Sequence, residues 1–225
     1  MPGPIHSRQV RRVRYNGRVD IESPLIRPFA SGDLDDLYRI CLQTADNGQD
    51  GTAAFRDRRL PGDVYAVPYA LLEPSLALVA EDPAGVGGYV VAALDSLDFD
   101  RRLERDWWPT LRARYPEPPP EETLELSAQE RFALNFIHHP WTTDPDLAGL
   151  YPSQLHINLL PRLQGRGLGS QMIAVLTSLL RSQGSTGVHL HVGRANHRAA
   201  GFYQHVGFAE LPGTATRTFA MSLQP

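Results

Sequence analysis

The chain has 225 residues, of which 42% are hydrophobic and 21% are charged, a composition that excludes a disordered, collagen-like or coiled-coil protein. Its net charge of −3 argues against a general nucleic-acid binder. The length is enough to bury a full core in one large domain or two small ones.

Residues 1–22 are rich in arginine and precede the first strand that we expect. This pattern is typical either of an arm that seeks nucleic acid or phosphate, or of a solvated tail or a hairpin around Asn16-Gly17. We favour the tail or hairpin, so nucleic acid is not an expected partner. The segment lacks the apolar core of a signal peptide.

The run LIRPF at 25–29 predicts a strand that ends at Pro28, and the segment after it predicts a helix capped by Ser31. Cys41 lies in the apolar pattern of that helix, so we interpret it as a small buried hydrophobic residue rather than a nucleophile. Because it is the single cysteine, no intrachain disulfide can form, and we expect a protein of the reducing cytoplasm.

Residues 46–63 are polar and contain glycine, which predicts a loop. The strand-like runs at 75–82 and 87–95 are joined by Pro-Ala-Gly-Val, which predicts an antiparallel hairpin. Apolar runs such as YVVAAL at 89–94 are too short to cross a bilayer, so we expect a soluble protein without a membrane partner.

The long region after this hairpin is mixed in character. It predicts a helix at 101–115, an extended proline-rich stretch at 116–122 and a helix at 127–137 capped by Ser127. None of these segments resembles an independent domain, so we expect them to be part of one domain.

The next strand, predicted at 154–160, alternates apolar and polar side chains. One face carries Leu155, Ile157 and Leu159, and the other carries Gln154, His156 and Asn158. His156 is a candidate general base because its unperturbed pKa is about 6.5, and a structural histidine is the alternative. Asn158 cannot act as a base but can orient a water molecule or the substrate.

A loop with three alternating glycines follows in LLPRLQGRGLGSQMI at 159–173 and leads into a helix. Gly165, Gly167 and Gly169 free the backbone, and the first helical turn then offers unpaired N–H groups and the positive end of the helix dipole. This is an anion site suited to a pyrophosphate, to which Arg162 and Arg166 can add contacts. The spacing matches neither the dinucleotide fingerprint nor a Walker A loop, and a plain strand-to-helix turn is the alternative.

The remaining elements are a core-facing helix that ends at Gly184, a strand at 187–192, a helix at 196–208 and a last strand at 216–223. Asn196 is the expected cap of the second of these helices. The eight histidines and one cysteine show no metal-ligand spacing, so we expect no metal site.

Two motifs in this part of the chain match signatures of one enzyme family. Gln164, Gly167 and Gly169 fit the pattern Gln/Arg-x-x-Gly-x-Gly/Ala. A second pattern, Asn-x-x-Ala-x-x-Phe-Tyr-x-x-x-Gly-Phe, is matched by Asn196, Ala199, Phe202, Tyr203, Gly207 and Phe208. With these motifs the chain resembles the GNAT family of acetyl-CoA-dependent acyltransferases, and the segment IRPF...D at 26–33 is also similar to the start of that family.

This resemblance implies an α/β (α+β) fold in which helices flank a mixed, mostly antiparallel sheet. The sheet is expected to splay into a V between the strands at 154–160 and 187–192, where pantetheine inserts. Residues 23–225 then form a single acetyltransferase domain with inserts at about 46–63 and 96–150, which shape the acceptor pocket.

The resemblance also implies acetyl-CoA as the acetyl donor, an amine of a small molecule or protein as the acceptor, and direct attack. Tyr203 matches the family position that protonates the departing thiolate, and a packing aromatic is the alternative. Together with His156, it makes up the catalytic residues that we expect. The expected acetyl-CoA contacts are Leu159, Leu160, Gln164, Gly165, Arg166, Gly167, Leu168, Gly169, Ser170, Asn196, Ala199, Phe202 and Tyr203.

A closer resemblance is to the acetyltransferase-like C-terminal region of O-GlcNAcase enzymes, carried by the segments 138–161 and 180–208. Some members of that group have a degraded glycine loop, whereas this chain keeps it whole. No glycoside hydrolase region is present, so we do not expect sugar cleavage. The alternative to an active enzyme is a catalytically silent acyl-CoA-binding or interaction module, and the sequence leaves the oligomeric state open, a homodimer included.

Overall fold

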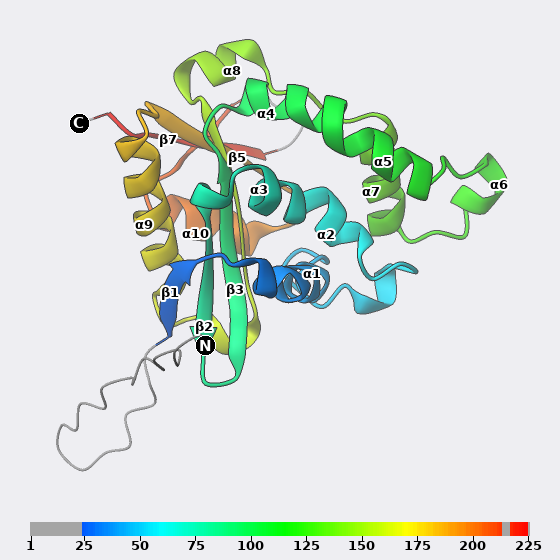
Figure 1. The fold of residues 1–225 in the computed structure, drawn as a ribbon, viewed down its shortest axis with the longest axis horizontal. Helices are drawn as coiled ribbons and strands as arrows, with labels where there is room; N and C mark the ends of the chain where they lie inside the picture. Colours follow the sequence, from blue (N-terminus) through cyan, green and yellow to red (C-terminus); the bar gives the residue numbers. More distant parts are fainter. Residues whose placement is uncertain (1–23, 213–216, 225) are drawn as a thin grey trace, which may run out of the picture.

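The computed structural model describes residues 24–212 and 217–224, so the predicted arm at 1–22 lies outside the described residues. The described strands form one sheet in the order β1-β2-β3-β4-β5-β7-β6 (Figure 1). Their bounds are β1 (Leu25–Pro28), β2 (Ala77–Asp82), β3 (Gly85–Ala93), β4 (Ser153–Leu159), β5 (Gly187–Val192), β6 (Ala209–Leu211) and β7 (Arg217–Ser222). All neighbouring pairs are antiparallel except β4 and β5, which confirms the predicted mixed, mostly antiparallel sheet.

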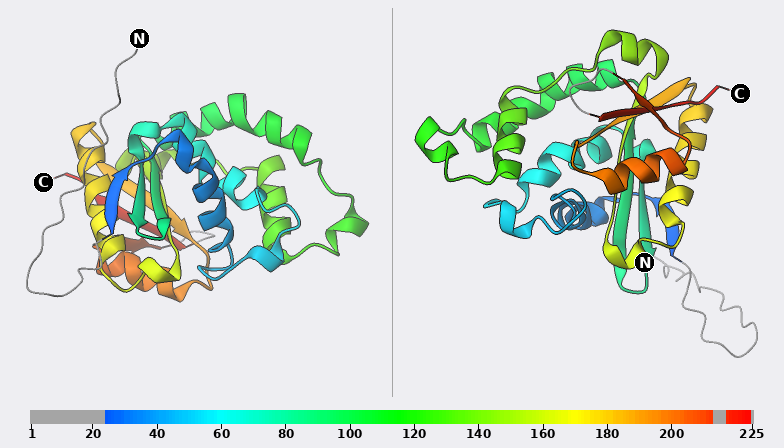
Figure 2. Two further views of the ribbon diagram at one scale, coloured as in Figure 1. Left: turned by 60° about the horizontal axis from the view of Figure 1, so that its bottom comes forward. Right: turned by 180° about the vertical axis from the view of Figure 1, so that it is seen from behind.

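Helices cover both faces of this sheet and extend beyond it on one side (Figures 1 and 2). They are α1 (Leu34–Leu42), α2 (Leu60–Tyr65), α3 (Val67–Leu72), α4 (Ser96–Arg102), α5 (Trp108–Arg114), α6 (Pro120–Thr123), α7 (Ala128–His138), α8 (Pro145–Leu150), α9 (Leu168–Ser182) and α10 (His197–His205). A π-helical turn joins α4 to α5. Figure 1 shows α5 and α7 on the side of the sheet away from α9.

The alternation of side chains along the hairpin strands decides which helix packs on which face. Val90 and Ala92 of β3 lie in one buried cluster with Met172 and Leu176 of α9. Their neighbours on the strand point the other way, because successive strand residues face opposite sides of a sheet. Tyr89 and Val91, with residues of β2, therefore pack against Leu37 and Ile40 of α1.

The single parallel pair is also the shortest contact between long strands. β4 pairs with β5 only at Ser153–Val188 and Gln154–His189, whereas its pairing with β3 continues to Leu159. The two strands part beyond these residues, so the sheet opens into the expected V.

Several local predictions need correction. Ser31 does not cap the first helix: it begins a 3-10 turn, and the Asp33 carboxylate accepts the Ala30 N–H instead (2.8 Å). Asp33 is held in that role by a bidentate pair with Arg27 of β1 (2.7 and 2.8 Å). The predicted loop at 46–63 becomes helical at Leu60, where α2 begins.

Other short elements were also not predicted. The extended stretch at 116–122 ends in the single turn of α6, and α3, α8 and β6 had no clear signal in the sequence. All four are six residues long or shorter, so the sequence gives little periodicity to find. The predicted caps at Ser127 and Asn196 are confirmed, because both side chains accept the expected backbone N–H.

A buried carboxylate fastens the second insert to the rest of the fold. Asp63 of α2 is 2% exposed and accepts hydrogen bonds from the hydroxyls of Tyr38 (2.5 Å) and Tyr115 (3.0 Å). Arg114 of α5 lies 3.2 Å from the same carboxylate, and Trp107 donates to the Asp63 backbone carbonyl. One side chain thus joins α1, α2 and the end of α5.

We predict that Asp63→Ala lowers the free energy of unfolding by about 3 kcal/mol, because it removes the buried carboxylate that Arg114 pairs with and that the Tyr38 and Tyr115 hydroxyls donate to, leaving Tyr115 with Asp57 alone. Asp36→Ala removes a carboxylate of α1 that pairs with Arg39 at the surface, and it should cost less than about 1 kcal/mol. Urea denaturation of both variants measures the difference. Equal losses would show that Asp63 does not fasten the insert.

Candidate functional site

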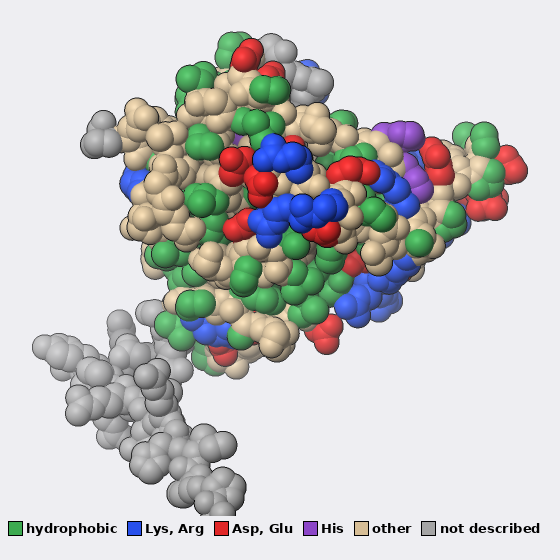
Figure 3. All heavy atoms as spheres, turned by 45° about the horizontal axis from the view of Figure 1, so that its top comes forward, with side chains coloured by type: hydrophobic (Ala, Val, Ile, Leu, Met, Phe, Trp, Pro, Cys, Tyr) green, Lys and Arg blue, Asp and Glu red, His purple; other side chains and the backbone are tan. Residues whose placement is uncertain are grey.

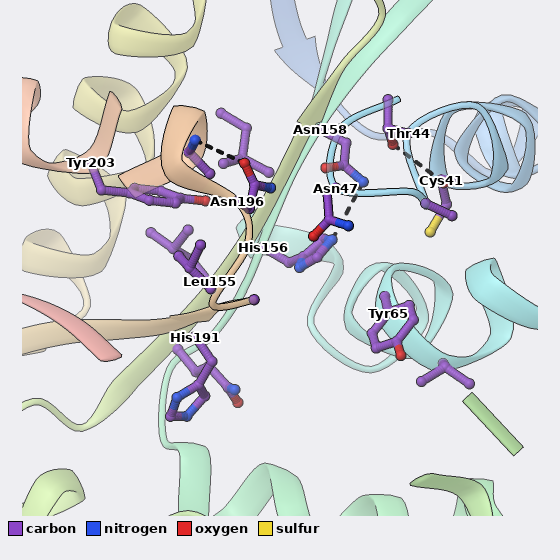
Figure 4. Close-up of a pocket in the computed structure, with 18 of the residues that line it drawn as sticks. Cys41, Thr44, Asn47, Tyr65, Leu155, His156, Asn158, His191, Asn196 and Tyr203 are labelled. Atoms are coloured by element: carbon purple, nitrogen blue, oxygen red, sulfur yellow. Dashed lines mark hydrogen bonds between the residues drawn. The ribbon is translucent and has the colours of Figure 1, made fainter. Parts of the chain in front are cut away.

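A cavity of about 1110 Å³ opens where β4 and β5 part (Figure 4). Its walls come from the glycine loop, β4, the end of β5 and α10 at one end, and from the two predicted inserts at the other. The predicted site residues that line it are His156, Leu159, Gln164, Gly165, Gly167, Gly169, Ser170, Asn196, Ala199, Phe202 and Tyr203. The loop and the second helix motif therefore meet in one cavity.

The glycine loop takes a backbone shape that other residues adopt only with strain. Gly165 and Gly167 have φ values of +72° and +73°, and Gly167 is the residue before the first turn of α9. The N–H groups of residues 168–170, in the first turn of this 15-residue helix, have no partner within the helix, and the positive end of the helix dipole lies at the loop. No acidic residue in that turn neutralises the positive end.

Gly169 serves a different purpose, which is close packing. A Cβ at this position would lie 3.1 Å from Cζ of Phe202 and 3.2 Å from Cδ1 of Leu159. Its absence lets the start of α9 approach both α10 and β4.

Gln164 ties the loop to the neighbouring elements. Its side-chain amide donates to the Leu159 carbonyl (2.6 Å) and accepts from the Arg198 guanidinium (2.5 Å). Arg198 lines the cavity and was missed by the sequence analysis, although it lies within the second motif. Arg162, which we expected near the loop, instead contacts Asp82 (3.2 Å) and the Gly85 carbonyl (2.8 Å) at the β2–β3 hairpin.

The register of β3 and β4 shows which backbone groups face the cavity. The Leu160 N–H donates to the Gly87 carbonyl (2.8 Å), and Leu159 lies opposite Gly88. Since residues of an antiparallel pair alternate between bonding the partner and pointing away, Leu159 and Ile157 direct their N–H and C=O groups away from β3. These groups face the gap where β5 has departed.

Two predicted contacts are core residues. Leu160 is 7% exposed, and its N–H and C=O are committed to Gly87 and to Leu163 (2.9 Å). Leu168 is 3% exposed, so only its backbone N–H faces the loop. Arg166 is exposed on the loop, and none of the described carboxylates lies within ion-pair distance of it.

Tyr203 points from α10 into the cavity (Figure 4). Its ring packs on those of Phe202, Phe208 and Phe219, with centroids 5.3, 5.6 and 5.9 Å away. Burial raises the pKa of Tyr203 above that of an ordinary tyrosine, so its hydroxyl stays protonated at neutral pH. Asn196 supports the same helix by accepting the Ala199 N–H (3.0 Å).

His156 lies between two tyrosine rings in the middle of the cavity wall. The rings of Tyr65 and Tyr89 are each 6.1 Å away and nearly parallel to the imidazole, at 17° and 22°. Burial lowers the pKa of His156 to about 4, so the ring is neutral at pH 7 and a weaker base than we expected. Neither tyrosine was predicted, because their approach depends on long-range packing.

A polar chain continues from His156 to the core. The Asn158 amide lies 3.4 Å from Nε2 of His156 and donates to the Tyr89 hydroxyl (2.9 Å). Tyr89 in turn hydrogen-bonds Cys41, and burial raises the pKa of that cysteine to about 12. The Cys41 sulfur is therefore a thiol at neutral pH, as expected for a residue that is not a nucleophile.

Residues 24–212 and 217–224 contain no group of three or more His, Cys, Asp or Glu side chains arranged to hold a metal ion. In the same part of the chain, no helix combines the length and apolarity that crossing a membrane would require.

Comparisons with known proteins agree with this geometry. The sequence pattern of the acetyltransferase (GNAT) family matches residues 101–208. The chain is similar to Protein O-GlcNAcase of Rattus norvegicus and of Mus musculus. In each case the identity is 26% over 186 residues, which are 83% of this chain. The chain spans about a fifth of the length of these relatives, since the match covers 20% of each.

Solved structures share the fold over most of the chain. The crystal structure of SsHAT is 34% identical, with a TM-score of 0.80 over 90% of this chain and 100% of that one. A phosphinothricin acetyltransferase from Sinorhizobium meliloti, solved in complex with acetyl-CoA, is 14% identical over 88% of each chain, with a TM-score of 0.51. The second likeness is one of fold alone.

We predict that the His156 ring titrates with a midpoint near pH 4, well below the pKa of about 6.5 of a free histidine, because the buried ring is hard to charge. Its ring signals in NMR spectra, assigned by their loss in His156→Phe, give the midpoint. Replacing Tyr65 by Ala opens one side of the stack to water and should raise the midpoint. A midpoint of 6.5 or more in the unchanged protein would contradict this assignment.

Proposed function

The chain belongs to the GNAT family of acetyltransferases, and from this membership and the cavity we propose that it transfers acetyl from acetyl-CoA to an amine. The acceptor is a small molecule or a protein. The observation that carries the proposal is that the glycine loop, the parted strands and the Tyr203 hydroxyl converge on one cavity.

The groups at the loop end suit acetyl-CoA. The N–H groups of residues 168–170 and the guanidinium of Arg166 offer donors to the pyrophosphate, and Arg198 adds a second positive charge at the loop. The backbone of Ile157 and Leu159 on the open edge of β4 can bond the pantetheine amides. Acetyl-CoA supplies a thioester whose carbonyl is open to attack by an amine.

Tyr203 is the group that we assign to the leaving side of the reaction. A thiol has a pKa of about 8.5, so the departing sulfur gains from a proton donor near neutral pH. The raised pKa of Tyr203 keeps its hydroxyl protonated at neutral pH, so it can donate a hydrogen bond to the sulfur while the carbon–sulfur bond breaks. Its ring is fixed on three phenylalanines, which holds the hydroxyl in the cavity.

His156 is the residue that we assign to the acceptor side. A free amine has a pKa of about 10.4 and is mostly protonated at pH 7, and a base with a pKa of about 4 cannot deprotonate it efficiently. We expect the amine to give up that first proton to water. His156 accepts the second proton as the carbon–nitrogen bond forms, when the nitrogen becomes far more acidic.

A second candidate function is a catalytically silent acyl-CoA-binding or interaction module. It is favoured by the weak basicity of His156 and by the match to O-GlcNAcase. Acetyl-CoA turnover, measured with and without a panel of amines, separates the two candidates. Tight binding without turnover on any amine would support the module.

We predict that Gly167→Gln abolishes acetyl-CoA binding measured by calorimetry while the protein stays folded. A Cβ at Gly167 meets no atom within 4 Å, so the new side chain fits but projects into the loop. The left-handed backbone adds a strain of about 1–2 kcal/mol. Gly184→Gln is the matched control, because Gly184 has φ +90° and equal space at the other end of α9. Wild-type affinity in a folded Gly167→Gln protein would disprove the pyrophosphate site.

We predict that Tyr203→Phe lowers kcat by about 10²–10⁴-fold and leaves the Kd for acetyl-CoA nearly unchanged, because only the proton donor is lost. Steady-state kinetics on an active amine, with calorimetry of acetyl-CoA binding, gives both constants. Tyr151→Phe, at a tyrosine that does not line the cavity, is the control. Wild-type kcat in Tyr203→Phe would make Tyr203 a packing residue.

A further inference from the structure

The far end of the cavity is lined by aromatic rings that the transfer chemistry does not use. Phe136 of α7 is the centre of this aromatic wall, with ring centroids 6.4 Å from Tyr65, 5.8 Å from Trp108 and 5.6 Å from Trp141. Phe132 extends it, 5.4 Å from Trp141. All five residues line the cavity, so the second insert supplies most of this end.

The aromatic wall runs from the surface to the reaction site. Trp141 and Phe132 are 50% and 45% exposed, which places them at the mouth. Tyr65, at the inner end, stacks on His156. A ligand that enters past Trp141 therefore reaches His156 along a continuous aromatic surface.

One carboxylate at this end of the cavity forms no ion pair with a described residue. The acidic side chains that line the cavity are Asp100 and Glu104. Glu104 pairs with Arg112 through two bonds (2.6 and 2.9 Å). Asp100 takes part in none of the ion pairs of the described residues, although the charge of the neighbouring Arg101 acts on it. Asp100 accepts the Thr143 backbone N–H (2.7 Å) and a hydrogen bond from the Thr143 side chain, which still leaves acceptor capacity on the two carboxylate oxygens.

Asp100 differs in this respect from the carboxylate on the outer face of the same helix. On the outer face of α4, Asp98 pairs with Arg101 (3.1 Å), and Figure 3 shows arginine and carboxylate side chains side by side on that face of the molecule. Burial raises the pKa of Asp100, and the hydrogen bonds from Thr143 and the charge of Arg101 offset this rise only in part. The opposite end of the cavity carries Arg194 and Arg198, so the cavity has a basic end and an acidic end.

Asp100 and His156 lie near different aromatic rings of the cavity. His156 stacks on Tyr65, whereas the charge of Asp100 acts on Tyr69, which stacks on Phe99 of the same helix (4.4 Å). A ligand with two amino groups could therefore place one of them at His156 and the other at the Asp100 carboxylate.

On the basis of the proposed function, we propose that the acceptor is an amine with a second positive charge, such as a linear diamine. The reacting amino group lies at His156, and the other group remains an ammonium ion bound to Asp100. The connecting chain packs on the aromatic wall, whose ring faces also attract cations.

The test compares 1,6-diaminohexane with hexylamine, which differ by one ammonium group, in calorimetric titrations with and without saturating coenzyme A. We expect the unchanged protein to bind the diamine roughly ten- to a hundredfold more tightly, as for a hydrogen bond to a charged group. Asp100→Asn keeps an acceptor for Thr143 and should remove this preference. Asp98→Asn removes the same charge from the outer face of α4 and should retain it.

Equal affinity for the two amines, no binding of either, or an undiminished preference in Asp100→Asn would overturn the proposal. Because binding requires no transfer, the result is independent of the proposed function. A preference for the diamine without acetyl-CoA turnover would support the Asp100 subsite and contradict the proposed acetyltransferase activity. Turnover on hexylamine without a preference for the diamine would support the activity and contradict the subsite.

Discussion

The parting of β4 from β5 is the constraint on which the rest of the structure depends. A strand inside a sheet normally bonds to a neighbour on each side, and unpaired buried backbone groups destabilise a fold. Here β4 has two paired residues on the β5 side and then faces a cavity. Gln164 supplies one substitute partner by donating to the Leu159 carbonyl, and the proposed acetyl-CoA would supply partners for other groups of this edge. The β5 side of β4 is therefore open beyond its first two residues, and the cavity takes the place of a neighbouring strand.

The cavity that opens between β4 and β5 has different charges at its two ends. The helix that continues from β4 presents its positive end to the cavity, while the inserts close the opposite end with aromatic rings and the carboxylates of Asp100 and Glu104. The groups proposed to react lie between these ends, where burial keeps Tyr203 protonated and His156 neutral. Both side chains are uncharged at neutral pH, so neither adds charge to the middle of the cavity.

The sequence predicted the parts whose cause is local. The glycine loop, the Asn196 cap and the alternation in β4 each depend on residues within a few positions, and the structure has all three. At the start of α1, the Asp33 carboxylate rather than the Ser31 hydroxyl bonds the backbone, and Arg27 on another element holds that carboxylate in place. Similarly, the stacking of Tyr65 on His156 joins positions 91 residues apart, and no local pattern reports such a contact. The family resemblance predicted residues of a candidate site that line one cavity, but not the environment that sets the pKa of its candidate base.

The two ends of the cavity rest on separate cores. Phe99, Trp108, Ala133 and Ile137 belong to a buried cluster of the inserts, distinct from the cluster in which α9 packs on the sheet. Substitutions in the insert cluster can therefore reshape one end of the cavity while leaving the packing of the glycine loop intact. In evolutionary terms, the acceptor preference of such a protein can drift under its own selection, while selection for the donor holds the other half constant.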